Sequence, residues 1–74
     1  MSFEELIAYV AVDVAADGRT TLDTFTAPHD TAARRRTLSA AEGVVVSLWR
    51  GGELVGHWRR GGGGGFQPAP GAPA

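Results

Sequence analysis

The sequence predicts a small α+β domain in the order ββαββ, with two antiparallel hairpins, one helix and a disordered C-terminal tail. Two stretches, 6–26 and 43–59, each hold two strand-like runs that are separated by a glycine turn. The Ala- and Arg-rich stretch between them has the composition of a helix. Five consecutive glycines and several prolines then follow. We therefore expect one folded domain at 1–60 and a flexible Gly/Pro/Ala-rich tail at 61–74.

The length of the chain and its lack of cysteine limit how it can be stabilised. With 74 residues and no cysteine, it has room for one domain and no disulfide. A chain of this size buries only roughly 60% of the surface that its unfolded form exposes, so its core is marginal by itself. Binding to another folded chain adds stability. We therefore expect a homo-oligomer, such as a dimer, or a larger protein partner.

The N-terminal residues bear on where the protein acts. Glu4 and Glu5 make this end acidic, whereas a secretory signal begins with basic residues. No apolar run approaches the length of about 18 residues that a membrane-spanning helix needs. The sequence therefore predicts a cytoplasmic protein without membrane contact.

The first hairpin is predicted at 6–26. Residues 6–14 carry β-branched side chains at every second position near their end, and 20–26 is a Thr-rich run that alternates in polarity. An Asp-Gly pair between them supplies the turn. A helix is the alternative for residues 3–16, because Ser2 and Glu5 fit a capping box. We favour the strand, since β-branched residues are poor helix formers.

The register of this hairpin depends on the length of its loop. A three-residue loop at 17–19 would place Val14 opposite Leu22. A two-residue loop would place Val14 opposite Thr21 instead. The better apolar match favours the three-residue loop, which includes a bulge.

The helix is predicted from the residues that flank it. Pro28 ends the preceding strand, Asp30 or Thr31 can cap the helix, and Gly43 is a favoured residue just after a helix end. Leu38 is the only large apolar side chain between these limits. Such a helix is weak alone, and its alanines predict close packing on a sheet.

The second hairpin, at 43–59, turns at Gly51-Gly52. A regular two-residue loop pairs Arg50 with Glu53, Trp49 with Leu54, Leu48 with Val55 and Val45 with Trp58. One face then holds Val45, Trp49, Leu54 and Trp58, and the other holds Val44, Val46, Leu48 and Val55. One helix covers only one of these apolar faces. We therefore expect the face with both tryptophans to be an interface, with Trp49, Trp58, Leu54 and Val45 as the interaction residues.

Arginines dominate the second half of the chain, although the net charge is −1. Three are consecutive on the predicted helix, and three flank the strands of the second hairpin. Together they could form a basic surface for anions or nucleic acid, which is an alternative function. The set is Arg34, Arg35, Arg36, Arg50, Arg59 and Arg60.

No residue pattern indicates catalysis. His29 and His57 are the only histidines, and neither has the spacing of a metal ligand pair. No glycine pattern follows a strand and opens a helix, as a phosphate-binding loop would. We expect a non-enzymatic interaction or assembly module, without metal or cofactor, that self-associates through its second hairpin.

The order hairpin, helix, hairpin, followed by Trp58-Arg59-Arg60-Gly61-Gly62, resembles a ubiquitin-like β-grasp domain with its basic and diglycine C-terminus. The resemblance implies a protein modifier that is processed near Gly62 and joined to a target through that residue. Such a modifier is the third possible function.

Overall fold

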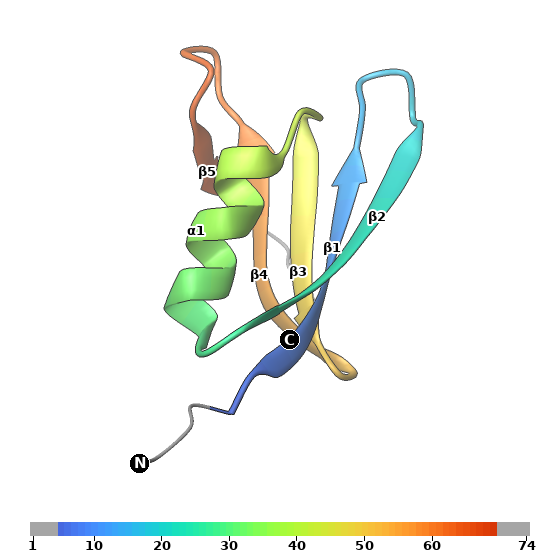
Figure 1. Cartoon of the computed structure of the whole chain (residues 1–74). Helices are drawn as coiled ribbons and strands as arrows, with labels where there is room; N and C mark the ends of the chain where they lie inside the picture. Colours follow the sequence, from blue (N-terminus) through green and yellow to red (C-terminus); the bar gives the residue numbers. More distant parts are fainter. Residues whose placement is uncertain (1–4, 70–74) are drawn as a thin grey trace.

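A computed structural model describes residues 5–69 of the chain. One helix lies on one face of a five-stranded antiparallel sheet, whose strand order is β2-β1-β3-β4-β5 (Figure 1). The elements are β1 (Ile7–Val14), β2 (Thr20–Ala27), α1 (Asp30–Ala40), β3 (Val45–Arg50), β4 (Glu53–Arg60) and β5 (Phe66–Pro68). The α+β class is confirmed, and the sheet has one strand more than the predicted ββαββ order.

The additional strand, β5, lies within the segment that was predicted as a tail. Phe66 pairs with Arg60 of β4, and Pro68 pairs with Trp58. The Arg60 guanidinium lies 4.3 Å from the centre of the Phe66 ring, and its Nη1 donates to the carbonyl of Gly64 at 2.6 Å. Three residues are too few to show the period of a strand, so the sequence could not predict it. Residues 70–74 of the predicted tail lie outside the described part of the chain.

The first hairpin consists of two strands, so the helix predicted as an alternative is wrong for 7–14. Its register also differs from both predicted ones, because Val14 pairs with Thr20. Counted between the hydrogen-bonded residues Ala15 and Arg19, the loop has the predicted three residues, but they are 16–18 instead of 17–19. It is closed by hydrogen bonds from the Ala15 N–H to the Arg19 carbonyl (2.8 Å) and from the Gly18 N–H to the Ala15 carbonyl (2.9 Å). Leu22 consequently lies opposite Val12.

The helix α1 begins at Asp30, and the residue that caps it is His29 rather than the predicted Asp30 or Thr31. The Nδ1 atom of His29 accepts a hydrogen bond from the Ala32 N–H at 3.0 Å. Asp30 does not cap the helix because its carboxylate binds Tyr9 and Arg50 of the sheet. His29 therefore satisfies a free N–H of the first turn.

The chain after α1 crosses close to the end of β1, where Gly43 is required. A Cβ atom at this position would collide with the backbone carbonyl of Val14. The Asp13 carboxylate accepts hydrogen bonds from the N–H groups of Glu42 and Gly43, both at 2.9 Å. Gly43 thus serves close packing, whereas the sequence assigned it to the helix end; the helix already ends at Ala40.

A β-bulge changes the second hairpin. Trp49 pairs with Leu54 as predicted, but Leu48 then pairs with Gly56, which leaves Val55 as the extra residue. Beyond the bulge, each residue of β4 pairs with the β3 residue one position later than predicted, so Trp58 pairs with Val46 instead of Val45. A displacement of one residue moves a side chain to the opposite face of a sheet. The predicted pairs of Leu48 with Val55 and of Val45 with Trp58 are therefore wrong.

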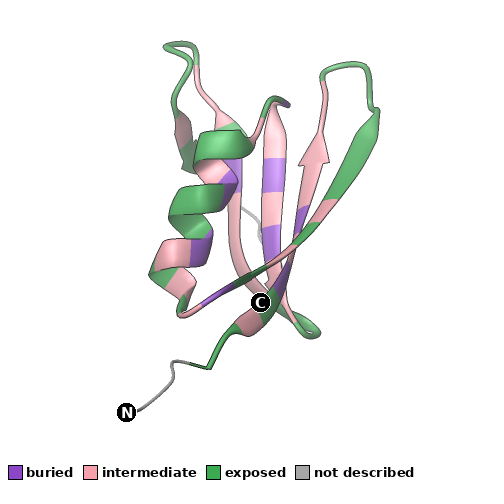
Figure 2. Cartoon of the chain, in the orientation of Figure 1, coloured by how far each residue is buried: buried purple, intermediate pink, exposed green. Residues whose placement is uncertain are grey.

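The core lies between the sheet and α1, where Figure 2 shows the buried residues on the surfaces that face each other. It comprises Tyr9, Ala11, Ala27, Ala33, Val46, Leu48 and Trp58. The bulge places Trp58 in this core, where it is only 7% exposed. Its ring lies directly against Gly56, because a Cβ there would collide with ring atoms of Trp58. Burial of the large indole beneath the helix explains why the bulged register is preferred.

Candidate functional site

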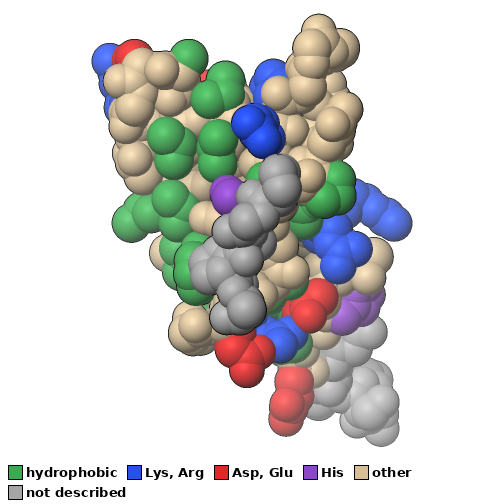
Figure 3. Space-filling model, turned by 180° about the vertical axis from the view of Figure 1, so that it is seen from behind, with side chains coloured by type: hydrophobic (Ala, Val, Ile, Leu, Met, Phe, Trp, Pro, Cys, Tyr) green, Lys and Arg blue, Asp and Glu red, His purple; other side chains and the backbone are tan. Residues whose placement is uncertain are grey.

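The face of the sheet that points away from α1 carries an apolar surface. Figure 3 shows this face, with hydrophobic side chains gathered over the β1–β2 hairpin. The alternation of side chains along paired strands assigns its members. We call them the open face: Val10, Val12 and Val14 of β1, Leu22 of β2, Val45 and Trp49 of β3, and Leu54 of β4. The valines, Trp49 and Leu54 are half-buried, and Leu22 is 66% exposed.

The open face includes three of the four residues predicted for the interface. Val45, Trp49 and Leu54 lie on it, whereas Trp58 lies in the core on the other side of the sheet. The expectation that both tryptophans share one face is therefore wrong, and the bulge at Val55 is the cause. The valines of β1 replace Trp58 as neighbours of Trp49, since Val10 pairs directly with Trp49.

Sequence analysis did not assign the β1 valines to the site. Their alternation was visible and predicted a strand, but the sequence did not indicate that β1 lies between β2 and β3. That position makes Val10, Val12 and Val14 the central row of the open face. A long-range pairing across 30 residues or more of chain leaves no local signal, so only a prediction of strand order could have found it.

A polar pair lies within the apolar surface. The indole N–H of Trp49 donates to the Ser47 hydroxyl at 3.0 Å, and both residues belong to β3. This bond satisfies the one polar atom of the indole and limits the orientations of its ring. His57 pairs with Ser47 from β4, and no described residue bonds to its buried Nδ1 atom. The open face therefore presents a positioned aromatic ring beside aliphatic side chains, which suits contact with another apolar surface.

Arg50, one of the predicted anion-binding residues, belongs to an ion-pair cluster on the helix side of the sheet. Its Nη1 donates to Asp30 at 2.6 Å, and its Nη2 lies 2.9 Å from Glu53. The Tyr9 hydroxyl also donates to Asp30 at 2.6 Å. Hydrogen bonds from Tyr9 and Arg50 lower the pKa of Asp30. Burial and, after it, the bond to Asp30 raise the pKa of Tyr9.

Two further arginines are bound within the chain. Arg60 donates from Nε to the carbonyl of Gly43 at 2.9 Å and from Nη2 to that of Ala41 at 3.1 Å, which ties β4 to the connection after α1. The Arg36 guanidinium lies 4.5 Å from the centre of the Phe25 ring and 3.7 Å from the Asp23 carboxylate. Both side chains therefore have structural contacts that a nucleic acid would have to replace.

Of the remaining three arginines, only Arg59 lies on the other side of the sheet from α1. Arg34 and Arg35 are exposed on α1. Arg59 pairs with Val45, which places its exposed side chain on the open face, on the opposite side of the sheet. The structure thus places Arg59 on the opposite side of the sheet from the other five arginines of the predicted set.

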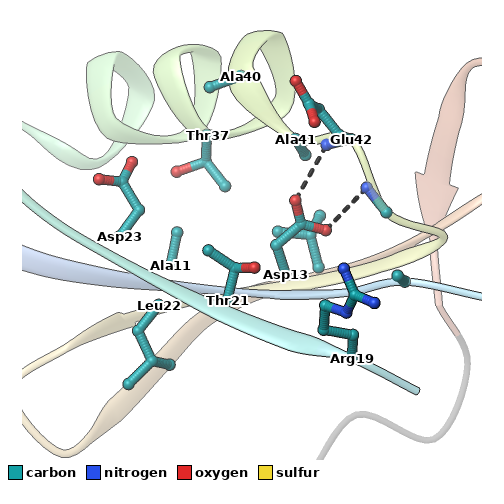
Figure 4. Close-up of a pocket in the computed structure, with 13 residues that line it drawn as sticks. Ala11, Asp13, Arg19, Thr21, Leu22, Asp23, Thr37, Ala40, Ala41 and Glu42 are labelled. Atoms are coloured by element: carbon teal, nitrogen blue, oxygen red, sulfur yellow. Dashed lines mark hydrogen bonds between the residues drawn. The ribbon is translucent and has the colours of Figure 1, made fainter. Parts of the chain in front are cut away.

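A cleft of about 530 Å³ separates the C-terminal half of α1 from the β1–β2 hairpin (Figure 4). Asp13, Asp23 and Glu42 contribute carboxylates, and Thr37 lies between α1 and the sheet with its Oγ1 buried and unbonded by any described residue. The Asp13 carboxylate accepts hydrogen bonds from two backbone N–H groups, and the Asp23 carboxylate forms an ion pair with Arg36. Both carboxylates therefore have partners within the chain. Within residues 5–69, no group of three or more His, Asp or Glu side chains could hold a metal ion.

The diglycine of the ubiquitin-like resemblance lies in the connection between β4 and β5. Gly62 is exposed there, and the Gly61 N–H donates to the Gly65 carbonyl at 2.8 Å. Cleavage at this point would separate β5 from the sheet. Gly62 is thus part of a closed turn between two paired strands.

Comparison with known proteins gives no relative: no family model, no curated protein and no solved structure matches this chain. In the part of the chain that the structure describes, no helix has the length and apolar character needed to cross a membrane.

Proposed function

We propose that this protein is a non-enzymatic assembly module that self-associates by packing its open face against the open face of a second copy. The observation that carries the proposal is that the single helix covers one side of the sheet, while the other side presents a continuous row of valines beside Trp49. Contiguous apolar surfaces of this kind mark interaction sites in small proteins. The second hairpin contributes Val45, Trp49 and Leu54 to the contact, and the valines of β1 form the centre of the contact.

A second copy is the proposed occupant because the open face is almost free of charge. Arg59 is the one Asp, Glu or Arg side chain that the strand registers assign to this side of β1, β3 and β4. Two identical faces can therefore meet without facing like charges across their centre. Sheets pack face to face at about 10 Å with interdigitating side chains, and β-branched residues fill such an interface well. A two-fold axis would place the same residues on both sides.

The test is sedimentation velocity over a range of micromolar concentrations. We expect the natural chain to associate, and we expect Val12→Glu to associate more weakly, because it would bury an unpaired carboxylate in the contact between the open faces. The matched control is Ser39→Glu, which adds the same charge at an exposed position of α1 and leaves association unchanged. Far-UV circular dichroism verifies that both variants are folded.

Two results would overturn this proposal. One is a natural chain that remains monomeric throughout the concentration range. The other is a folded Val12→Glu variant that associates as strongly as the natural chain.

A further inference from the structure

The two edges of the sheet differ in how they are protected. β5 is three residues long and ends at Pro68, which has no N–H to offer. β2 is eight residues long, and among residues 5–69 it pairs with β1 alone. Short strands, proline, lysine and bulges are the usual means by which proteins block an edge. β2 has none of these. Its one charged side chain, Asp23, is of a kind that discourages pairing, but Arg36 lies 3.7 Å from this carboxylate, so the outer backbone groups of β2 still offer a template for another strand.

The hydrogen bonding of the first hairpin identifies the free backbone groups. The Ala15 N–H donates to the Arg19 carbonyl, so the odd-numbered residues of β2 direct their backbone groups towards β1. The even-numbered residues Thr20, Leu22, Thr24 and Thr26 direct theirs outwards. All four are exposed. An incoming strand therefore finds donors and acceptors at every second residue, flanked by Thr side chains that favour sheet structure.

We propose that this edge pairs antiparallel with the same edge of a second copy, with Thr24 opposite Thr24. This contact uses a different surface from the open face and goes beyond the proposed function. The outward backbone groups of the two β2 strands can bond only if even-numbered residues of one strand pair with even-numbered residues of the other. Two such registers give the longest overlap, centred on Asp23 (residues 20–26) or on Thr24 (residues 21–27).

Charge distinguishes between these two registers. Centring on Asp23 would place the Asp23 carboxylates of both copies directly opposite each other, which is unfavourable. Centring on Thr24 places Asp23 opposite Phe25 of the second copy. The Arg36 guanidinium lies over that Phe25 ring and 3.7 Å from its own Asp23 carboxylate, so each copy would share this cation with the carboxylate of the other. The Thr24 register therefore replaces a repulsion with two attractions that are related by symmetry.

Pairing at this edge also suits the rest of the molecule. It joins the two five-stranded sheets into one continuous sheet, with both helices on one side and both open faces on the other. The two open faces then form one apolar surface of twice the area. Edge pairing and face packing are thus compatible, and each can be tested without the other.

Cysteine cross-linking tests the register, because the chain has no cysteine of its own. Opposite residues in a hydrogen-bonded antiparallel pair have their Cα atoms about 5.5 Å apart, within the range that a disulfide spans. We expect Thr24→Cys to form a disulfide-linked dimer under mild oxidation. The matched control is Thr26→Cys, whose thiols would lie four residues out of register, or about 13 Å apart, and should cross-link about tenfold more slowly.

Cross-linking of both cysteine variants at the same rate, or of neither, would overturn the proposed register. A second variant tests the pairing itself. Thr24→Pro removes an outward N–H without removing a bond to β1, so the chain should fold but lose the edge contact, whereas Thr24→Val should keep it. A folded Thr24→Pro variant that associates unchanged would contradict edge pairing.

The double variant Thr24→Cys/Val12→Glu separates the two proposals. We expect it to cross-link as fast as Thr24→Cys, because the edge contact does not need the open face. Loss of cross-linking in this folded variant would refute a separate edge contact. If instead Thr24→Cys cross-links but Val12→Glu leaves the association of the natural chain unchanged, edge pairing stands and the proposed function fails.

Discussion

The two faces of the sheet are built from the same strands, yet they differ sharply in packing. On the helix side, Leu48 is 0% and Val46 is 1% exposed. On the open face, their strand neighbours Val45 and Trp49 are half-buried. The side chains of both faces are similarly apolar, so composition does not decide which face becomes the core. The position of α1 decides it.

The helix reaches its face because small residues allow a close approach. Ala33 and Thr37 are the buried residues of α1, and Leu38 is the one large apolar side chain that packs from it. Gly43 and Gly56 extend this pattern to the connection after α1 and to β4. Large side chains come from the sheet and small ones from the helix. The difference teaches that a helix with little apolar surface of its own can complete one face and leave an equivalent face that no other helix or strand of residues 5–69 covers.

The largest expected effect compares the two tryptophans. Trp58→Ala should destabilise the fold by about 3–5 kcal/mol, because it removes the largest side chain of the core. Trp49→Ala should cost about 1 kcal/mol or less in the monomer, since its ring lies on the half-exposed face. Urea unfolding measures both, at two protein concentrations so that association is separated from folding. Equal losses in the two variants would mean that the bulge does not divide the tryptophans between the faces.

A smaller effect tests the bulge through its glycine. Gly56→Ala places a methyl group where the Trp58 ring now lies, and overpacking of this kind costs about 1–3 kcal/mol. The matched control is Gly52→Ala in the β3–β4 turn, where a Cβ would meet no atom within 4 Å. Thermal or urea unfolding should show a clear loss for the first variant and almost none for the second. A neutral Gly56→Ala variant would contradict the contact between this ring and the strand.

Much of the fold could be predicted from the sequence because it depends on neighbouring residues. The alternation of Val10, Val12 and Val14 and the turn at Gly51-Gly52 are local signals, and both indicate strands that the structure contains. The helix was also predicted, within a few residues at each end. Its cap was not, because Asp30 binds two residues of the sheet that are distant in sequence.

The parts of the candidate site that were not predicted depend on distant contacts. The isolated Gly56 was the one local signal of a bulge in the second hairpin, whereas the burial of Trp58 between the sheet and α1 depends on distant contacts. The position of β1 between β2 and β3 is likewise a property of the whole sheet. Val45, Trp49 and Leu54 were therefore assigned to an interface from local alternation alone, whereas the β1 valines beside them were not.

The smallest expected effect concerns charge, which also distinguishes the two faces. The helix side ends in the cluster of Tyr9, Asp30 and Arg50, whereas the open face carries Arg59 alone of the Asp, Glu and Arg side chains on β1, β3 and β4. Because the pKa of folded Asp30 is lowered, its stabilising contribution is present above its ordinary pKa of 3.8 and is lost as the pH falls through the lowered value. The stability difference between the natural chain and Asp30→Asn should therefore shrink as the pH falls below about 4. A difference that stays constant down to acidic pH would show that the carboxylate does not favour the folded state.

The same cluster predicts the opposite dependence at alkaline pH. The pKa of folded Tyr9 is raised above its ordinary value of 10.0, so the folded state favours the neutral phenol. Its contribution is complete below pH 10.0 and is lost as the pH rises through the raised value, where a phenolate would face the Asp30 carboxylate. Tyr9→Phe removes this titration and keeps the ring, so its stability should change less between pH 9 and 11 than that of the natural chain. Parallel stability curves for the two proteins in this range would contradict the coupling of Tyr9 to Asp30.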